Sequence, residues 1–116
     1  MKFLNFFLIV VIFLISSSCS KTEKKISQIK EDRLEMQMID AYNEGLKELN
    51  RGDIFFAAKK FNEVELIYPQ SIWAPRSVLM AAYAYYSQLY YIDAIIELER
   101  FLDKYQNHPD RDYAYY

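Results

Sequence analysis

Large apolar residues recur every three or four positions from Met36 onward, and this spacing constrains the fold more than any other feature of the sequence. The first segment follows it at Ile39, Tyr42, Leu46 and Leu49. On an α-helix, residues spaced in this way share one face. Only two glycines and three prolines occur among the 116 residues, and 53% of the residues are hydrophobic. A disordered or collagen-like chain is therefore excluded, and an all-α fold is predicted.

Turn-forming residues divide this part of the chain into helices with short connections. Gly52 favours a helix stop and Asp53 favours an N-cap. A first helix over residues 36–50 and a second helix after Asp53 are therefore predicted, and Pro69 ends the second. The second helix is expected to turn five residues toward the core: Phe56, Ala57, Phe61, Val64 and Tyr68.

Three further helices are predicted beyond Pro69. Ser71 is expected to cap a helix that reaches residue 87, and another helix follows over residues 91–105. Asp110 is expected to cap a fifth helix that the chain does not finish. His108, beside Pro109, is interpreted as fixing the corner before that helix.

The first 18 residues have the order of a secretory signal peptide, with Lys2, a run over residues 3–15 that is apolar except for Asn5, and then serines. The run is shorter than the roughly 20 apolar residues of a membrane-spanning helix, so export is predicted. Cys19 follows small residues, as in the lipobox of bacterial lipoproteins, although Ser16 stands where an aliphatic residue is usual. We predict that Cys19 is lipidated, and the alternative is a free thiol. Ser20 after the cysteine, in place of Asp, is compatible with transfer to the outer membrane.

Three segments follow from this organisation. Residues 1–18 are predicted to form the signal peptide. Residues 19–33, rich in Lys, Glu, Ser and Gln, are predicted to be a solvated tether, and a frayed helix is the alternative. Residues 34–116 form one small helical domain.

An internal repeat relates the predicted helices at an offset of 37 residues. Ala57 matches Ala94 and Tyr68 matches Tyr105 under this offset, and small and large residues also alternate in step. Tetratricopeptide repeats have a period of 34 and the same helix–turn–helix alternation. The sequence therefore predicts a tetratricopeptide-like solenoid of helical hairpins, with two repeats and the start of a third.

An ordered series of motifs makes the resemblance more specific. The motifs are Tyr68-Pro69-Gln70-Ser71, the stretch AYAYY at residues 82–86, Arg100-Phe101, and His108-Pro109 followed by residues 112–116. Behind a lipoprotein-like N-terminus, this series resembles the N-terminal half of the BamD family, the tetratricopeptide lipoproteins of the bacterial machinery that assembles outer-membrane β-barrels. The resemblance implies a lipid-anchored periplasmic scaffold at the outer membrane. It also implies that the N-terminal repeats bind unfolded barrel proteins and that the missing C-terminal repeats hold partner subunits.

The repeat register also predicts a peptide-binding groove, because one face of each first helix lines the concave side of such a stack. Tyrosine offers an apolar ring with a hydroxyl at its rim, which suits an extended chain ending in an aromatic residue. Arg76 is expected to pair with a carboxylate there. The alternative for each tyrosine is packing within its hairpin. The predicted groove residues are Ile39, Tyr42, Leu46, Arg76, Leu79, Tyr83, Tyr86, Tyr113 and Tyr116.

Composition argues against other classes of function. The formal net charge is −2, so no basic field exists to hold nucleic acid. One Cys and one His are too few for a zinc cluster or a Cys/His catalytic pair, so no metal, cofactor or catalytic residue is predicted. Two non-enzymatic functions remain: a barrel-assembly scaffold, or another periplasmic tetratricopeptide adaptor, for example in cell-envelope coordination.

Overall fold

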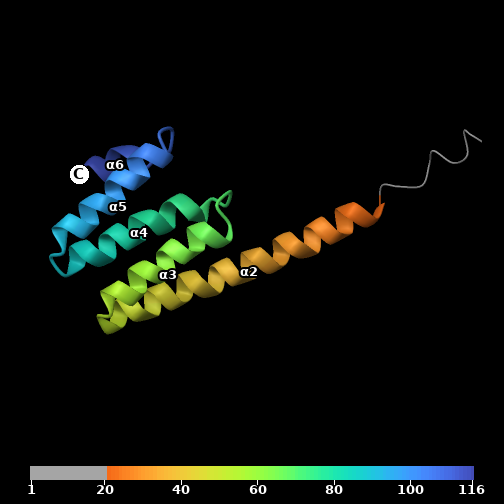
Figure 1. The fold of residues 1–116 in the computed structure, drawn as a ribbon, viewed down its shortest axis with the longest axis horizontal. Coiled ribbons are helices and arrows are strands. Elements are labelled where there is room, and N and C mark those ends of the chain that lie inside the picture. The colour runs from red at the N-terminus through yellow and green to blue at the C-terminus, as the bar shows by residue number, and fades with distance from the viewer. Residues whose placement is uncertain (1–20) are drawn as a thin grey trace, which may run out of the picture. The chain divides into compact units, whose positions relative to one another are not determined.

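The computed structural model describes residues 21–116, and all regular structure in that part of the chain is helical (Figure 1). The predicted all-α fold of successive helical hairpins is confirmed. The predicted signal peptide and the predicted lipidation site Cys19 lie outside the described residues. The helices are α2 (Lys21–Arg51), α3 (Ile54–Ile67), α4 (Trp73–Ser87), α5 (Tyr91–Lys104) and α6 (Arg111–Tyr115).

Helix α2 begins well before residue 36, where the apolar periodicity led us to expect the first helix. Lysine, glutamate and glutamine are good helix formers, so their abundance extends the helix without an apolar stripe. The compact unit that contains the other helices starts at Arg33, and the first residues of α2 belong to a separate unit. Residues 21–33 are therefore helical, and their service as a spacer stays a prediction.

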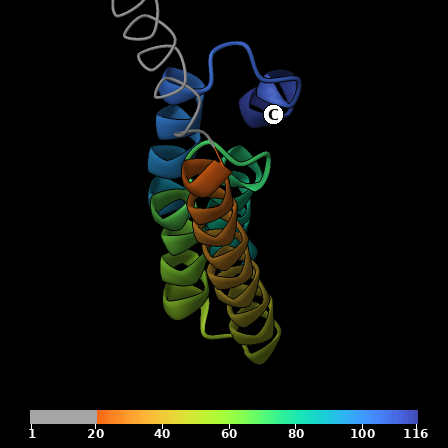
Figure 2. The same ribbon diagram turned by 90° about the vertical axis from the view of Figure 1, so that its right-hand side faces the viewer.

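Two layers make up the compact unit. Seen at right angles to the first view, α3 and α5 lie in one layer, while the C-terminal half of α2, α4 and α6 lie in the other (Figure 2). This is the arrangement of stacked helical hairpins, in which the first helices form one surface and the second helices the other. None of the helices within residues 21–116 is long and apolar enough to cross a membrane.

The turns inside the two hairpins have the same geometry. In the first turn, the N–H of Gly52 donates to the carbonyl of Leu49 and the N–H of Asp53 donates to that of Glu48, at 3.1 and 3.0 Å. This pair of bonds is the Schellman motif, and Gly52 takes the left-handed conformation with φ of 85°. Asp53 then caps α3 as predicted, because its Oδ1 accepts from the N–H of Phe56.

The second turn repeats those bonds 37 residues later. The N–H of Leu89 donates to Tyr86 and that of Tyr90 to Tyr85, both at 3.0 Å. Leu89 occupies the position of Gly52 and has a φ of 66°, which is unfavourable for a residue with a Cβ. The repeat offset predicted from the sequence is therefore present in the backbone.

The buried face of α3 is made of Ile54, Ala57, Ala58, Phe61, Val64 and Glu65. Phe56 is not part of it, contrary to the prediction, since its side chain is exposed and the ammonium groups of Lys59 and Lys60 lie 5.9 and 5.6 Å from its ring. The true face starts at Ile54, two residues earlier. Ala57 and Ala58, both fully buried, let α4 approach α3 closely.

The starts of α4 and α6 differ in their caps. Ser71 Oγ accepts from the N–H of Ala74 at 3.1 Å, as predicted. Asp110 is the N-cap residue of α6, as predicted, but within residues 21–116 its carboxylate accepts from no backbone N–H. Instead, the N–H of Asp110 donates to Nδ1 of His108 at 3.2 Å. The His108 ring packs edge-on against Phe101, with ring centres 5.6 Å apart, so His108 fixes the corner as predicted.

Candidate functional site

A groove of about 290 Å³ opens between α4, α5 and α6. Five of the nine predicted groove residues line it: Leu79, Tyr83, Tyr86, Tyr113 and Tyr116. Three further lining residues, Ala82, Ala94 and Leu98, were not among those predicted. They belong to the faces where α4 and α5 meet, which the alternation of small and large residues would have identified.

Small residues form the floor of this groove and tyrosines form its walls. Ala82 and Ala94 are 3% and 4% exposed and lie deep in the groove. Tyr83 and Tyr86 on α4 are 51% and 59% exposed, so much of each ring faces solvent. Tyr86 also packs against Tyr91 of α5, with ring centres 5.8 Å apart. The groove therefore offers an apolar bottom and aromatic sides that end in hydroxyl groups.

Two of the predicted residues, Tyr42 and Leu46, are instead packed where α2 meets α3 and α4. Tyr42 lies between Phe61 and Trp73, with ring centres 5.4 and 5.3 Å away. Burial raises its pKa, and the nearby positive charge of Arg76 offsets part of that rise. Leu46 packs against the buried cluster around Phe61. The register put both on the groove surface, but α4 covers this part of α2.

Ile39 and Arg76 are placed elsewhere too. Ile39 is 44% exposed on α2 and lies outside the groove lining. The guanidinium carbon of Arg76 lies 5.6 Å from the centre of the Trp73 ring. Arg76 borders a different hollow, next to Tyr105 and Pro109. The carboxylate partner predicted for Arg76 would therefore not lie in the groove.

Tyr85 points away from the groove, as predicted from its position one residue from Tyr86. Its ring packs edge-on against Phe55 of α3, with ring centres 5.9 Å apart. Burial raises its pKa, and the carboxylates of Glu97 and Asp93 add to the rise. Tyr85 thus belongs to the packing between hairpins.

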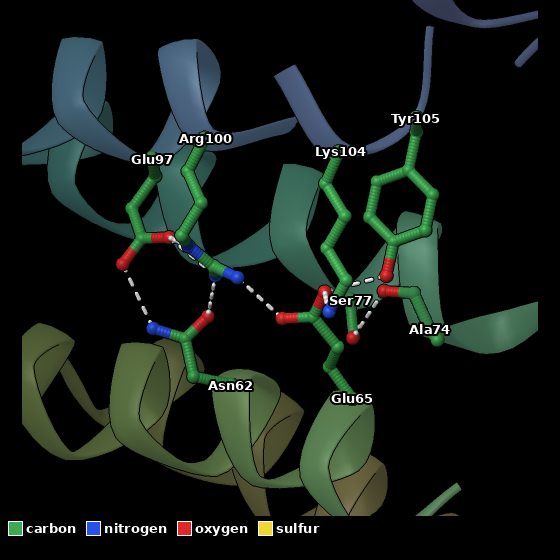
Figure 3. A network of polar contacts seen from close by, with 8 residues as sticks. All are labelled: Asn62, Glu65, Ala74, Ser77, Glu97, Arg100, Lys104 and Tyr105. Atoms are coloured by element: carbon green, nitrogen blue, oxygen red, sulfur yellow. Dashed lines mark hydrogen bonds and ion pairs between the residues drawn. The ribbon is translucent and has the colours of Figure 1, made fainter. Parts of the chain in front are cut away.

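A polar network joins α3 to α5, and its central residue was missed by the sequence reasoning (Figure 3). Glu65 is 4% exposed, and its carboxylate accepts from Arg100, Lys104 and Tyr105. The Lys104 ammonium is 2.9 Å from Glu65 Oε1. One signal was available, because Glu65 follows Phe61 by four residues and so shares the buried face of the helix.

The other half of the network surrounds Arg100. Its guanidinium donates to Oε2 of Glu97 and to Oδ1 of Asn62, both at 2.7 Å. Asn62 closes the ring by donating to Oε1 of Glu97 at 2.8 Å. Glu65 on α3 and Glu97 on α5 thus share one arginine. Neither glutamate pairs with the one two residues away in the sequence, which is Glu63 for Glu65 and Glu99 for Glu97.

The network shifts the pKa values of Glu65 and Tyr105 in opposite directions. Burial would raise the pKa of Glu65, but hydrogen bonds from Tyr105, Lys104 and Arg100 outweigh it and lower that pKa below the ordinary value. Burial and the negative charge of Glu65 raise the pKa of Tyr105 well above its usual range. A carboxylate whose pKa is lowered by three donors stays ionised near neutral pH and does not exchange a proton there. This cluster is therefore suited to joining helices and not to acid–base chemistry.

No three His, Cys, Asp or Glu side chains within residues 21–116 are grouped so that they could hold a metal ion. In the same part of the chain, every buried side-chain nitrogen or oxygen atom has a hydrogen-bond partner. The groove is an apolar, open surface among the described residues that a ligand could cover.

Stacked hairpins of this geometry define a tetratricopeptide-like helical repeat protein. Residues 34–116 match the family YfiO, described as outer membrane lipoprotein, and the chain belongs to that family. It is 35% identical over 100 residues to the outer membrane protein assembly factor BamD of Caulobacter vibrioides. It is 34% identical over 102 residues to the protein of that name from Neisseria gonorrhoeae. The predicted membership of the BamD family is confirmed.

These alignments cover 86% of this chain, but only 32% of the Caulobacter protein and 37% of the Neisseria protein. The chain thus spans about a third of the length of the curated relatives that it matches.

Proposed function

We propose that this chain is a lipid-anchored scaffold of outer-membrane β-barrel assembly, held at the periplasmic face of the outer membrane. The names of its relatives support the assembly role, and the description of its family supports the outer-membrane location. A scaffold works by binding, so the proposal includes no catalytic step. Its ligands are unfolded barrel proteins and partner subunits of the assembly machinery.

The tyrosine walls of the groove are the observation that carries the binding proposal. Tyr83, Tyr86 and Tyr113 are all more than half exposed beside an apolar floor. Tyrosine rings contribute large contact areas at a small cost in side-chain entropy, and their hydroxyl groups can bond to the free backbone groups of an extended peptide. An exported barrel chain supplies both exposed backbone groups and an aromatic terminus.

We expect the double variant Tyr83→Ala/Tyr86→Ala to bind such a peptide at least about tenfold more weakly, because aromatic anchors dominate interfaces of this kind. The measurement is a calorimetric titration with a peptide that copies the C-terminal strand of an outer-membrane barrel protein. Circular dichroism should show that helicity is retained, since both side chains are largely exposed.

The matched control is Tyr90→Ala/Tyr115→Ala, which removes two exposed tyrosines from outside the groove lining. Arg76→Glu reverses a charge that also lies outside the groove lining, so it serves as a charge control. Equal affinity in the groove variant and the tyrosine control would remove the groove from the binding site. That result would favour the alternative, a periplasmic adaptor that recognises another partner.

The anchor is tested at Cys19. Without residues 1–18 the chain has 13 basic and 16 acidic residues, a formal net charge of −3 that gives no attraction to anionic lipid, so membrane attachment should depend on acyl chains. Cys19→Ala should move the protein from the membrane fraction to the soluble periplasmic fraction, whereas Ser17→Ala, which keeps a small residue, should not. Mass spectrometry of the mature N-terminus that finds an unmodified Cys19 would contradict the proposal.

A further inference from the structure

We infer that the corner between α3 and α4, residues 66–73, is a surface that contacts the membrane to which the chain is proposed to be anchored (Figure 1). The inference rests on the proposed function, because it takes Cys19 as the point of attachment. Leu66 and Ile72 carry large apolar side chains that are 80% and 71% exposed, and Trp73, next to Ile72, is 36% exposed. Several exposed apolar side chains in one short segment mark an interaction surface.

The corner between α5 and α6, residues 103–110, shows that the backbone does not require these apolar side chains. Both corners contain the same backbone hydrogen bond at an offset of 37 residues, from the N–H of Ser71 to Tyr68 and from that of His108 to Tyr105, each at 3.0 Å. The apolar character of the first corner therefore has a cause other than the turn itself. The residues of the second corner that match Leu66, Ile72 and Trp73 are Asp103, Pro109 and Asp110.

Charge is almost absent from the part of the chain that contains the first corner. Between Glu65 and Asp93, Arg76 is the only charged residue, although charged residues make up 26% of the sequence. The guanidinium carbon of Arg76 lies 5.6 Å from the centre of the Trp73 ring. Tryptophan is enriched at the depth of lipid headgroups, and a guanidinium can pair with a lipid phosphate there. Since the Asp110 carboxylate borders the same hollow as Arg76, the surface is close to neutral and suits zwitterionic lipid.

The corner lies at the end of the compact unit from which the chain leads back to Cys19. Met38 of α2 packs in one cluster with Tyr68 of the corner. The ring of Tyr42, also on α2, lies 5.3 Å from that of Trp73. Cys19 precedes Met38 by 19 residues, so an anchor at Cys19 would hold this end of the unit near the lipid surface.

A lipid surface fits this corner better than a protein partner does. A stable protein interface takes roughly 20–30 residues from each side, whereas the corner offers three large apolar side chains within eight residues. Insertion of a few side chains into lipid is sufficient when the chain is already attached, because attachment keeps the corner at a high local concentration beside the surface.

Two unique residues allow a direct test, since Trp73 is the only tryptophan and Cys19 the only cysteine of the sequence. The chain that begins at Cys19 is coupled through its thiol to a maleimide lipid in phosphatidylcholine vesicles. The fluorescence of Trp73 is then compared between vesicles with and without lipids brominated near the headgroup end of their acyl chains. We expect brominated lipid to reduce the fluorescence at least about twofold, because a ring at headgroup depth meets the bromine atoms.

The double variant Leu66→Ser/Ile72→Ser keeps the fluorescent residue and should lose most of this quenching. Circular dichroism should show unchanged helicity, because both side chains are exposed. The matched control is Leu89→Ser/Ile92→Ser, which removes side chains that are 70% and 75% exposed at the other end of α4. It should be quenched as strongly as the unchanged chain.

Absence of quenching in the coupled unchanged chain overturns the inference and leaves the corner for a protein partner. Equal quenching in the corner variant and the unchanged chain also overturns it. Lipidation of Cys19 in the cell is a separate measurement, because chemical coupling does not depend on it. An unmodified Cys19 in the cell together with quenching on vesicles would place the fault in the proposed anchor, whereas a lipidated Cys19 without quenching would reject the membrane contact of the corner alone.

Discussion

Gly45 is a residue at which the packing of α2 against α3 leaves no room for a side chain. A Cβ built on it would lie 2.8 Å from Cε1 and 2.9 Å from Cδ1 of the Phe61 ring. Real Cβ atoms do not approach so closely, so the fully buried ring would have to move. The small residue that the repeat pattern required here thus has a direct steric cause.

We expect Gly45→Ala to lower the free energy of unfolding by about 1–2 kcal/mol, because overpacking outweighs the gain in helix propensity. Urea unfolding followed by circular dichroism measures the loss. Lys47→Ala, an exposed change in the same helix, should have little effect.

The second hairpin indicates how the loss could be relieved. There, Ala82 replaces the glycine, and Leu98 stands where the first hairpin has Phe61. The double variant Gly45→Ala/Phe61→Leu should therefore be less destabilised than the sum of the two single changes. Strict additivity would show that this contact does not limit the packing.

At the scale of the elements, the helix ends include one unfavourable backbone conformation, at Leu89. It adopts the left-handed conformation that Gly52 adopts in the first hairpin, and its side chain is 70% exposed. A left-handed conformation costs a residue with a Cβ roughly 1–2 kcal/mol, and little packing offsets that cost here.

Leu89→Gly should therefore stabilise the chain by about 0.5–1 kcal/mol, after allowing for the greater freedom of glycine in the unfolded chain. A rise in melting temperature reports the gain. The reciprocal change Gly52→Leu should destabilise the chain, although nothing lies within 4 Å of a Cβ at that position. If Leu89→Gly lowered the melting temperature, the exposed leucine would have to contribute packing in some other way.

Local signals explain which elements could be predicted from the sequence. Gly52, Asp53 and Ser71 act through hydrogen bonds within a few residues, so the ends of the helices could be read directly. The start of α2 could not, because high helix propensity without apolar periodicity also fits a tether. The position of Asp110 as the N-cap residue of α6 could be predicted, but the hydrogen bond from its own N–H to the His108 ring nitrogen could not, because that bond depends on how the corner folds.

The groove was predicted only in part for a related reason. The repeat offset identified Leu79 and the tyrosines of α4 and α6, since equivalent positions share a face. It could not show that α4 covers Tyr42 and Leu46, because coverage depends on where a helix lies in the stack. Position in the stack is a property of the assembled molecule.

Across the whole molecule, the network around Glu65 connects the two hairpins and makes stability depend on pH. The pKa of Glu65 is lowered in the folded state, so its contribution is present above the pKa of the unfolded chain and is lost as pH falls through the lower folded value. The pKa of Tyr105 is raised, so its contribution is present below about pH 10 and is lost at higher pH.

Glu65→Gln should lower the free energy of unfolding by about 1–3 kcal/mol at neutral pH, because Arg100 and Lys104 lose the carboxylate that they share. The difference from the unchanged chain should shrink as pH falls below about 4.3, the ordinary pKa of an unfolded glutamate, and should vanish once pH has passed below the lower pKa of the folded state. Urea unfolding across this range measures both effects.

Glu99→Gln, at an exposed position of α5, is the matched control and should alter neither stability nor its pH dependence appreciably. A difference for Glu65→Gln that stayed constant from neutral to acid pH would contradict the assigned charge of Glu65.

The same network has a consequence for how such a chain can evolve or be engineered. Under the repeat offset, Glu65 corresponds to Leu102, and Arg100 corresponds to Glu63. A copy of the second hairpin substituted for the first would leave Arg100 and Lys104 facing a leucine across the junction. The two hairpins are therefore not interchangeable, because only the first carries the buried carboxylate that pairs with the second. Exchanging or duplicating hairpins would require new partners for Arg100 and Lys104.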